Sequence, residues 1–129
     1  MIGRNELLAP AQRVYEVVDT SLGPVRIQSL TERQRSQWEA DSLDRNGKLS
    51  KKGLLTAKAR IIAESVVDEK GEKLFTPMDV DRLQDLDASV SNKLADACQR
   101  LSGISEADTD IEELEKNSEE IPSGSSPSA

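Results

Sequence analysis

The distribution of charge is the feature that most restricts what this chain can fold into. Residues 1–103 carry 16 basic and 16 acidic side chains, whereas residues 104–129 carry eight acids and one base, which accounts for the whole net charge of −7. The last eight residues are rich in serine and proline, a composition typical of flexible linkers. We therefore expect a loose arm at 1–12, a folded domain at 13–103 and a flexible acidic tail at 104–129.

Composition excludes several classes of function. The chain has no histidine and a single cysteine, Cys98, so a disulfide scaffold, a Cys/His zinc site and a catalytic triad that needs an imidazole are all ruled out. Net acidity and only three aromatic residues argue against a nucleic-acid surface. No apolar run is long enough for a membrane span or a signal peptide, and a lone thiol suits the cytoplasm. We expect a non-enzymatic cytoplasmic protein without a cofactor or metal.

The order of the expected elements predicts an α+β fold. Two β-branched runs within residues 14–27 are separated by turn-forming residues at 19–24, which predicts a β-hairpin with Pro24 at a strand start or an edge. Helices are expected at about 32–43, after Ser50, after Thr76 and at about 88–101, with a turn or small hairpin at 66–75. The expected architecture is an N-terminal hairpin packed on about four helices, followed by the disordered acidic tail.

Helix boundaries are marked by capping residues. Thr31 with Gln34 three positions later forms a capping-box pattern. Thr76 followed by Pro77 is the clearest helix start in the chain, and Gly103 suits a helix stop. These residues predict two helix starts, after Thr31 and after Thr76, and one helix end, before Gly103.

The helix that follows Ser50 is expected to form the centre of the core. Leu55, Ala59, Ile62 and Val66 fall on one helical face, and this element is the most apolar in the chain. A second apolar face is expected on the last helix, which includes Cys98. That cysteine is therefore expected to be a small buried hydrophobe rather than a nucleophile.

One cluster of basic residues lies around the start of the same helix: Lys48, Lys51, Lys52, Lys58 and Arg60. Lysines in the first turn oppose the helix dipole, so an acidic or phosphate-bearing partner is one explanation. The favoured interpretation is a solvated helix end that begins later than Lys51. The neighbouring loop at 44–48 resembles a calcium loop but lacks ligands at the first and twelfth positions.

Three residues are candidates for contact with a protein partner. Trp38 is the one large apolar residue on a polar helix, and we favour a core position for it over a surface anchor. Ile111 and Leu114 lie three residues apart among the acids of the tail, which gives that segment a docking face for coupled folding and binding.

Several stretches together resemble the tail assembly chaperones of long-tailed bacteriophages. They occur in order along nearly the whole chain: VVD at 17–19, GPVRI at 23–27, LTER at 30–33, AESVVDEKG at 63–71, LFT at 74–76, RLSGI at 100–104 and ELEKNS at 113–118. The combination carries the resemblance, since the family has no catalytic signature.

The resemblance implies a phage-encoded binding protein that acts in the cytoplasm of the infected host and is absent from the mature virion. Its expected partners are the tape measure protein, which it keeps soluble, and the tail tube protein, whose subunits it helps to recruit. Self-association stays open, and no residue contacts are transferred. The alternative function is a structural virion component, such as a head–tail connector or a minor tail subunit.

Overall fold

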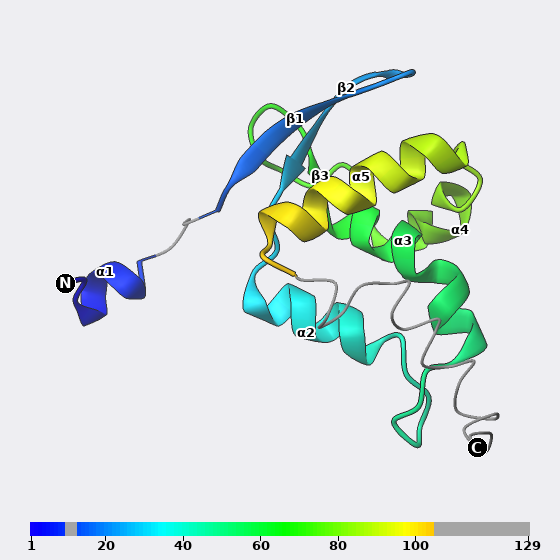
Figure 1. Ribbon diagram of the computed structural model, residues 1–129, viewed down its shortest axis with the longest axis horizontal. Coiled ribbons are helices and arrows are strands. Elements are labelled where there is room, and N and C mark those ends of the chain that lie inside the picture. The colour runs from blue at the N-terminus through cyan, green and yellow to red at the C-terminus, as the bar shows by residue number, and fades with distance from the viewer. Residues whose placement is uncertain (10–12, 105–129) are drawn as a thin grey trace, which may run out of the picture.

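A computed structural model describes residues 1–9 and 13–104 of the chain. Its elements confirm the expected α+β class, with a hairpin followed by helices (Figure 1). In chain order they are α1 (Arg4–Leu7), β1 (Tyr15–Thr20), β2 (Gly23–Gln28), α2 (Glu32–Ala40), α3 (Lys51–Ser65), β3 (Val66–Val67), the 3₁₀ helix η1 (Pro77–Asp79), α4 (Val80–Leu83) and α5 (Ala88–Leu101).

The hairpin forms where the alternating β-branched residues predict it. Strands β1 and β2 pair antiparallel from Tyr15 opposite Gln28 to Thr20 opposite Gly23, and Gly23 has the positive φ of 125° that the tight turn requires. Pro24 is the second residue of β2, in agreement with its expected place at a strand start.

The small hairpin expected as one alternative at 66–75 forms in part, since Val67 makes an antiparallel bridge with Lys73, but the pairing of this segment with β2 was not predicted. After α3 ends, Val66 and Val67 pair antiparallel with Ile27 and Arg26, so the sheet has the order β1-β2-β3. Val66 therefore belongs to a strand and not to the apolar stripe of the helix. Its side chain is nevertheless buried, as is that of Val67, because the sheet and the helices share one core.

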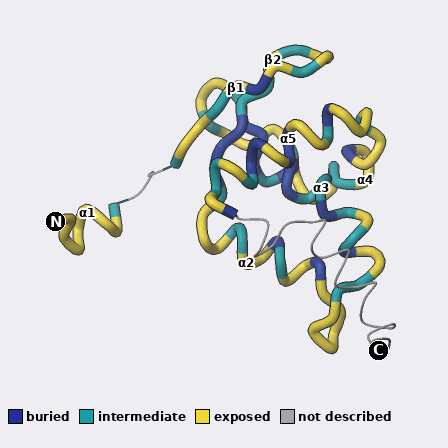
Figure 2. Tube along the Cα trace, in the orientation of Figure 1, coloured by how far each residue is buried: buried dark blue, intermediate teal, exposed yellow. Residues whose placement is uncertain are grey.

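Helix α5 lies between the hairpin and α3 and contacts both, while α2 packs on another part of α3 (Figure 1). The buried positions accordingly gather where the sheet, α3 and α5 meet (Figure 2). Cys98 of α5 is fully buried there, and burial raises the pKa of its thiol. This placement confirms the interpretation of Cys98 as a core residue.

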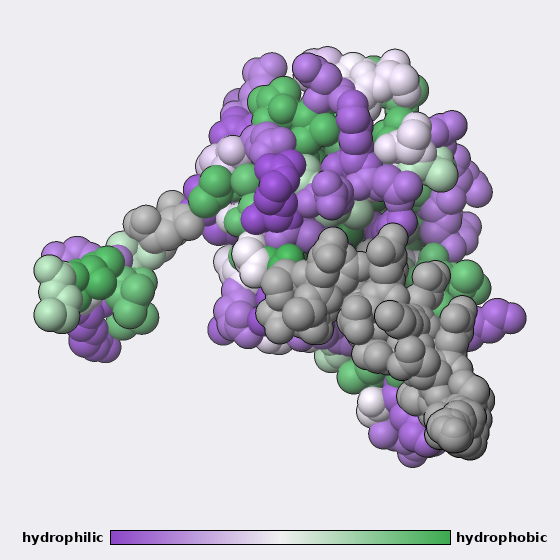
Figure 3. Space-filling view, in the orientation of Figure 1, coloured by the Kyte–Doolittle hydropathy of each residue, from purple (hydrophilic) through white to green (hydrophobic). Residues whose placement is uncertain are grey.

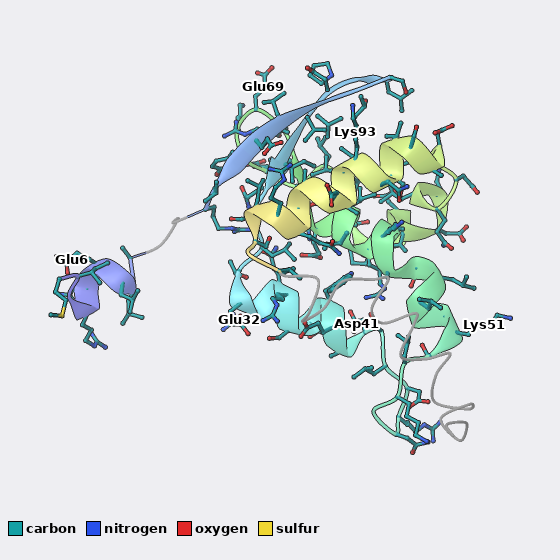
Figure 4. The ribbon with its side chains drawn as sticks, in the orientation of Figure 1. Glu6, Glu32, Asp41, Lys51, Glu69 and Lys93 are labelled. Atoms are coloured by element: carbon teal, nitrogen blue, oxygen red, sulfur yellow. The ribbon has the colours of Figure 1, made fainter. Side chains whose placement is uncertain are left out.

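Two polar contacts hold the hairpin against α5. The Lys93 ammonium donates to the backbone carbonyl of Asp19 at 2.8 Å, and Figure 4 shows Lys93 on the side of α5 that faces the hairpin. The Arg100 guanidinium donates to both carboxylate oxygens of Glu16, at 2.7 and 3.1 Å. That hydrogen bond lowers the pKa of Glu16 and raises the pKa of Arg100.

The predicted helix starts are confirmed by side-chain capping. The Thr31 hydroxyl accepts from the Gln34 amide at 3.1 Å, and the Gln34 side chain accepts in return from the Thr31 amide at 2.9 Å. Thr76 forms a similar box ahead of Pro77, although the first turn is 3₁₀ rather than α-helical. At the other end of the domain Gly103 has φ +70°, as a C′ residue requires.

Four expectations about boundaries and burial are corrected. Helix α2 ends at Ala40 rather than near 43, and the arm expected at 1–12 contains the short helix α1. Leu55, expected in the core, is 64% exposed, because the first turns of α3 bury Gly53 and Ala57 instead. Ile104, assigned to the tail, is 9% exposed and its amide donates to the Gln99 carbonyl at 2.9 Å, so the folded body includes it.

Candidate partner-binding groove

An open apolar groove of about 860 Å³ lies between the hairpin tip, the 68–75 loop and the first half of α5. Two of its lining leucines are strongly exposed: Leu22 in the hairpin turn at 73% and Leu74 at 54%. Val17 of β1 is also exposed, at 62%, while the other apolar side chains line the groove more deeply, namely Val25, Phe75, Leu86, Val90 and Leu94. Grooves of this kind accept apolar side chains of a partner helix or strand.

The 68–75 loop that forms one wall of the groove is held by its own polar contacts. The Asp68 carboxylate accepts from the backbone amides of Glu72 at 3.0 Å and Lys70 at 2.8 Å, and the amide of Glu72 in particular lowers the pKa of Asp68. Gly71, with φ +85°, completes this tight turn. The wall is therefore set before any partner arrives, which reduces the entropy lost on binding.

A basic side chain joins the hairpin to the same loop. The Arg26 guanidinium lies 4.1 Å from the centre of the Tyr15 ring and donates to the backbone carbonyl of Glu69. Figure 4 shows Glu69 at the outer end of that loop, beside the hairpin. Charged side chains therefore surround the apolar groove: Arg26, Asp68, Glu69, Lys70 and Glu72.

A second apolar surface lies on the N-terminal arm. Met1, Ile2, Leu7 and Leu8 are all more than 60% exposed, and no residue of α1 is buried. Figure 3 shows hydrophobic surface on α1 and over the hairpin. A four-residue helix has too few hydrogen bonds to be stable alone in water, so contact with a partner would stabilise α1.

Trp38 lies in the core, which was the favoured of its two predicted placements. Its ring is 2% exposed and its indole nitrogen donates to the Ala57 carbonyl at 2.9 Å. A partner cannot contact this ring unless α2 moves away from α3. The predicted docking residues Ile111 and Leu114 lie outside the described residues.

Arg60 is a structural residue rather than part of a solvated helix end. Its guanidinium donates to the carbonyls of Trp38 at 2.8 Å and Gly53 at 2.9 Å, to the Ser42 hydroxyl at 2.7 Å and to the Thr56 hydroxyl at 2.9 Å. Burial lowers the pKa of Arg60. The side chain thus joins the end of α2 to the first turns of α3, beside a smaller groove of about 430 Å³.

The other members of the basic cluster behave differently. Helix α3 begins at Lys51, with the Ser50 hydroxyl accepting from the Gly53 amide at 2.8 Å, so the interpretation of a later helix start is wrong. Lys58 donates to Asn92 on α5. Lys48, Lys51 and Lys52 are exposed, and none of them makes an ion pair within the described residues.

The groove was missed at the level of sequence because its walls come from separate elements, and the periodicity within one element does not show which elements meet. The one available signal was Leu22, a large apolar residue in a two-residue turn where polar residues are the rule. Within residues 1–9 and 13–104 no three Cys, Asp or Glu side chains gather in a way that would hold a metal ion. The same part of the chain contains no helix long and apolar enough to cross a membrane.

Comparison with known proteins identifies the fold. No family model and no curated protein matches the sequence. Among solved structures the chain is similar to the tail assembly chaperone of bacteriophage HK97, with 14% sequence identity and a TM-score of 0.55. The match covers 76% of this chain and 98% of that chain. The fold of this chain is thus similar to that of the HK97 chaperone over nearly the full length of the HK97 protein.

Proposed function

We propose that the protein is a tail assembly chaperone of a long-tailed bacteriophage and that it binds the tape measure protein. The observation that carries this proposal is the shared fold, which extends over 98% of the HK97 chaperone. The ordered series of sequence stretches that resemble this family also supports the proposal.

The groove suits the binding of an unassembled helical chain. A tape measure protein before assembly is a long helical molecule whose apolar side chains have no partner. Burying one leucine-sized side chain contributes about 1.5–3 kcal/mol. A groove with two exposed leucines would therefore bind one site on the tape measure protein only moderately, and many copies would be needed to cover one long chain.

The acidic tail would contribute solubility rather than contact energy. Each bound copy would add its net charge of −7 to the complex, and like charges keep coated chains apart. Recruitment of tail tube subunits, a cytoplasmic location in the host and absence from the virion complete the proposed role.

The test is co-expression with the tape measure protein of the same phage, followed by measurement of the soluble tape fraction and of co-purification. The Leu22→Gln/Leu74→Gln variant should lower co-purification at least about tenfold, since it removes two apolar contacts from exposed positions. Met78→Gln is the matched control, because Met78 is 89% exposed and lies outside the groove.

Two results would contradict the proposal. The first is a tape measure protein that stays soluble alone and does not retain the wild-type chain. The second is recovery of the chain in stoichiometric amount from purified virions by mass spectrometry, which would establish the alternative of a structural component.

A further inference from the structure

The exposed side of the first turns of α3 combines basic and apolar side chains in a way that the proposed function does not use. Lys51, Leu55 and Lys58 are four and three residues apart and thus lie in one row along the helix, with Lys48 and Lys52 beside them. Figure 4 shows Lys51 extending away from α3 into solvent. We call this set of five residues the α3 basic face.

Within the described residues, the four lysines of this face form no ion pair, and the two carboxylates nearest in sequence accept hydrogen bonds from uncharged groups. Asp44 accepts from the backbone amides of Asn46 and Lys48, at 2.8 and 3.0 Å, and so holds its own turn. Asp41 accepts from the Gln37 side chain at 2.8 Å. The face is left with an excess of positive charge and with a leucine that is 64% exposed.

The chain itself contains a segment of complementary chemistry. Residues 106–120 carry eight acids and one base, and within them Ile111 and Leu114 are surrounded by Asp110, Glu112, Glu113 and Glu115. This segment is complementary to the α3 basic face, because its carboxylates can pair with the lysines and its two apolar side chains can contact the exposed leucine. We propose that this acidic segment docks in cis on the α3 basic face.

The distance allows the contact. Lys58 of α3 lies against Asn92 of α5, and the two helices run on from that point toward Ser65 and Leu101. At about 1.5 Å per helical residue, the end of α5 is then roughly 25 Å from Lys51. Seven extended residues from Ile104 to Ile111 span about 23 Å, and ten to Leu114 span about 33 Å.

Weak individual contacts are sufficient, because the segment is tethered. A short covalent connection holds the segment at an effective concentration in the millimolar range, so even a millimolar intrinsic affinity gives substantial occupancy. Docking also accounts for two lysines in the first turn of α3, where they oppose the helix dipole. The proposal does not depend on the function proposed above.

The test uses the full chain with a nitroxide spin label on Ser118→Cys and ¹⁵N-detected paramagnetic broadening. Cys98 is fully buried, and the wild-type chain serves as the control that it stays unlabelled. Backbone amides of Lys51, Lys52 and Leu55 should lose several-fold more intensity than that of Leu22 at the hairpin tip. The difference should disappear in about 0.5 M NaCl, where charges are screened within a few ångströms.

The variant Lys51→Glu/Lys52→Glu should abolish the broadening at α3. It is expected to fold, because carboxylates suit the first turn of a helix, and circular dichroism checks this. Arg4→Glu/Lys70→Glu is the matched control: it makes the same change in net charge at exposed sites outside the face and should leave the broadening intact.

Three outcomes would overturn the proposal. One is broadening that is uniform over the surface, and another is broadening at α3 that persists in high salt. The third comes from mixing spin-labelled unenriched chains with ¹⁵N-enriched wild type: broadening of α3 amides in that mixture would show docking between chains instead of in cis.

Discussion

Replacement of Gly53 by alanine should destabilise the protein, although the same change in most helices is stabilising. Gly53 is buried in the first turn of α3, against the backbone of Ser42. A Cβ at this position would lie 2.3 Å from the Ser42 carbonyl oxygen and 2.6 Å from its carbonyl carbon and Cα. These are backbone atoms, so no side-chain rotation can relieve the overlap.

The magnitude follows from the shift that the overlap requires. The Ser42 backbone must move by about 1 Å to restore normal van der Waals contact. This shift would break the 2.9 Å hydrogen bond from the Ser50 amide to the Ser42 carbonyl. It would also disturb the hydrogen bond from the Arg60 guanidinium to the Ser42 hydroxyl. Overpacking costs about 1–3 kcal/mol and a lost hydrogen bond about 1 kcal/mol more. Alanine has a higher helix propensity than glycine, which offsets about 1 kcal/mol of this loss. The expected net loss is about 1–3 kcal/mol.

The measurement is thermal and urea unfolding of Gly53→Ala, followed by circular dichroism and by fluorescence of Trp38, the single tryptophan, which packs beside this junction. A body of this size should lose about 4–8 °C in Tm per kcal/mol. Lys52→Ala, at the exposed neighbouring position, should change stability by less than about 0.5 kcal/mol. A Gly53→Ala protein as stable as the wild type, or more stable, would refute the packing argument.

Three further outcomes are expected. Arg60→Met should cost about 1.5–3 kcal/mol in urea unfolding, because the carbonyls and hydroxyls that the guanidinium joins lose their donor; an unchanged midpoint would contradict its structural role. Deletion of residues 105–129 should leave the melting temperature nearly unchanged, whereas deletion of 104–129 should lower it by several degrees through loss of buried Ile104; equal effects would place the domain boundary elsewhere. Since Arg100 lowers the pKa of Glu16, the pair stabilises the fold above the ordinary glutamate pKa of about 4.3, and this contribution is lost as pH falls through the lowered value. The melting temperature of Glu16→Gln should therefore lie below that of the wild type at pH 7 and converge with it in acid.

Local signals in the sequence predicted most of the elements. Capping residues such as Thr31, Thr76 and Gly103 act on neighbouring backbone groups, so their meaning does not depend on the rest of the fold. The hairpin was predictable for the same reason, since its turn and its alternating strands lie within 14 residues.

The errors concern features that depend on distant parts of the chain. Leu55 has the right periodicity for the core, but the first turns of α3 bury Gly53 and Ala57 and leave Leu55 64% exposed. A small hairpin at 66–75 was one of the alternatives, but the pairing of Val66 and Val67 with β2 joins residues 39 to 41 positions apart in sequence. Arg60 has the charge of a surface residue, and only the approach of the α2 end makes it a structural donor.

The candidate groove was beyond sequence analysis for a related reason. Its walls come from the hairpin tip, the 68–75 loop and α5, and no periodicity links these segments. The resemblance to phage chaperones implied a binding protein, but it assigned no partner-contacting residues and so did not indicate which face has the groove.

The central place of α5 has a consequence for how the protein is made. The hairpin and α3 are both covered by a helix that is translated after them, and this helix contributes Val90, Leu94, Ala95, Ala97 and Cys98 to the core. Until residue 101 has been synthesised, the nascent chain exposes the apolar sides of both earlier elements. Premature termination before α5 would therefore yield an aggregation-prone fragment instead of a smaller folded domain.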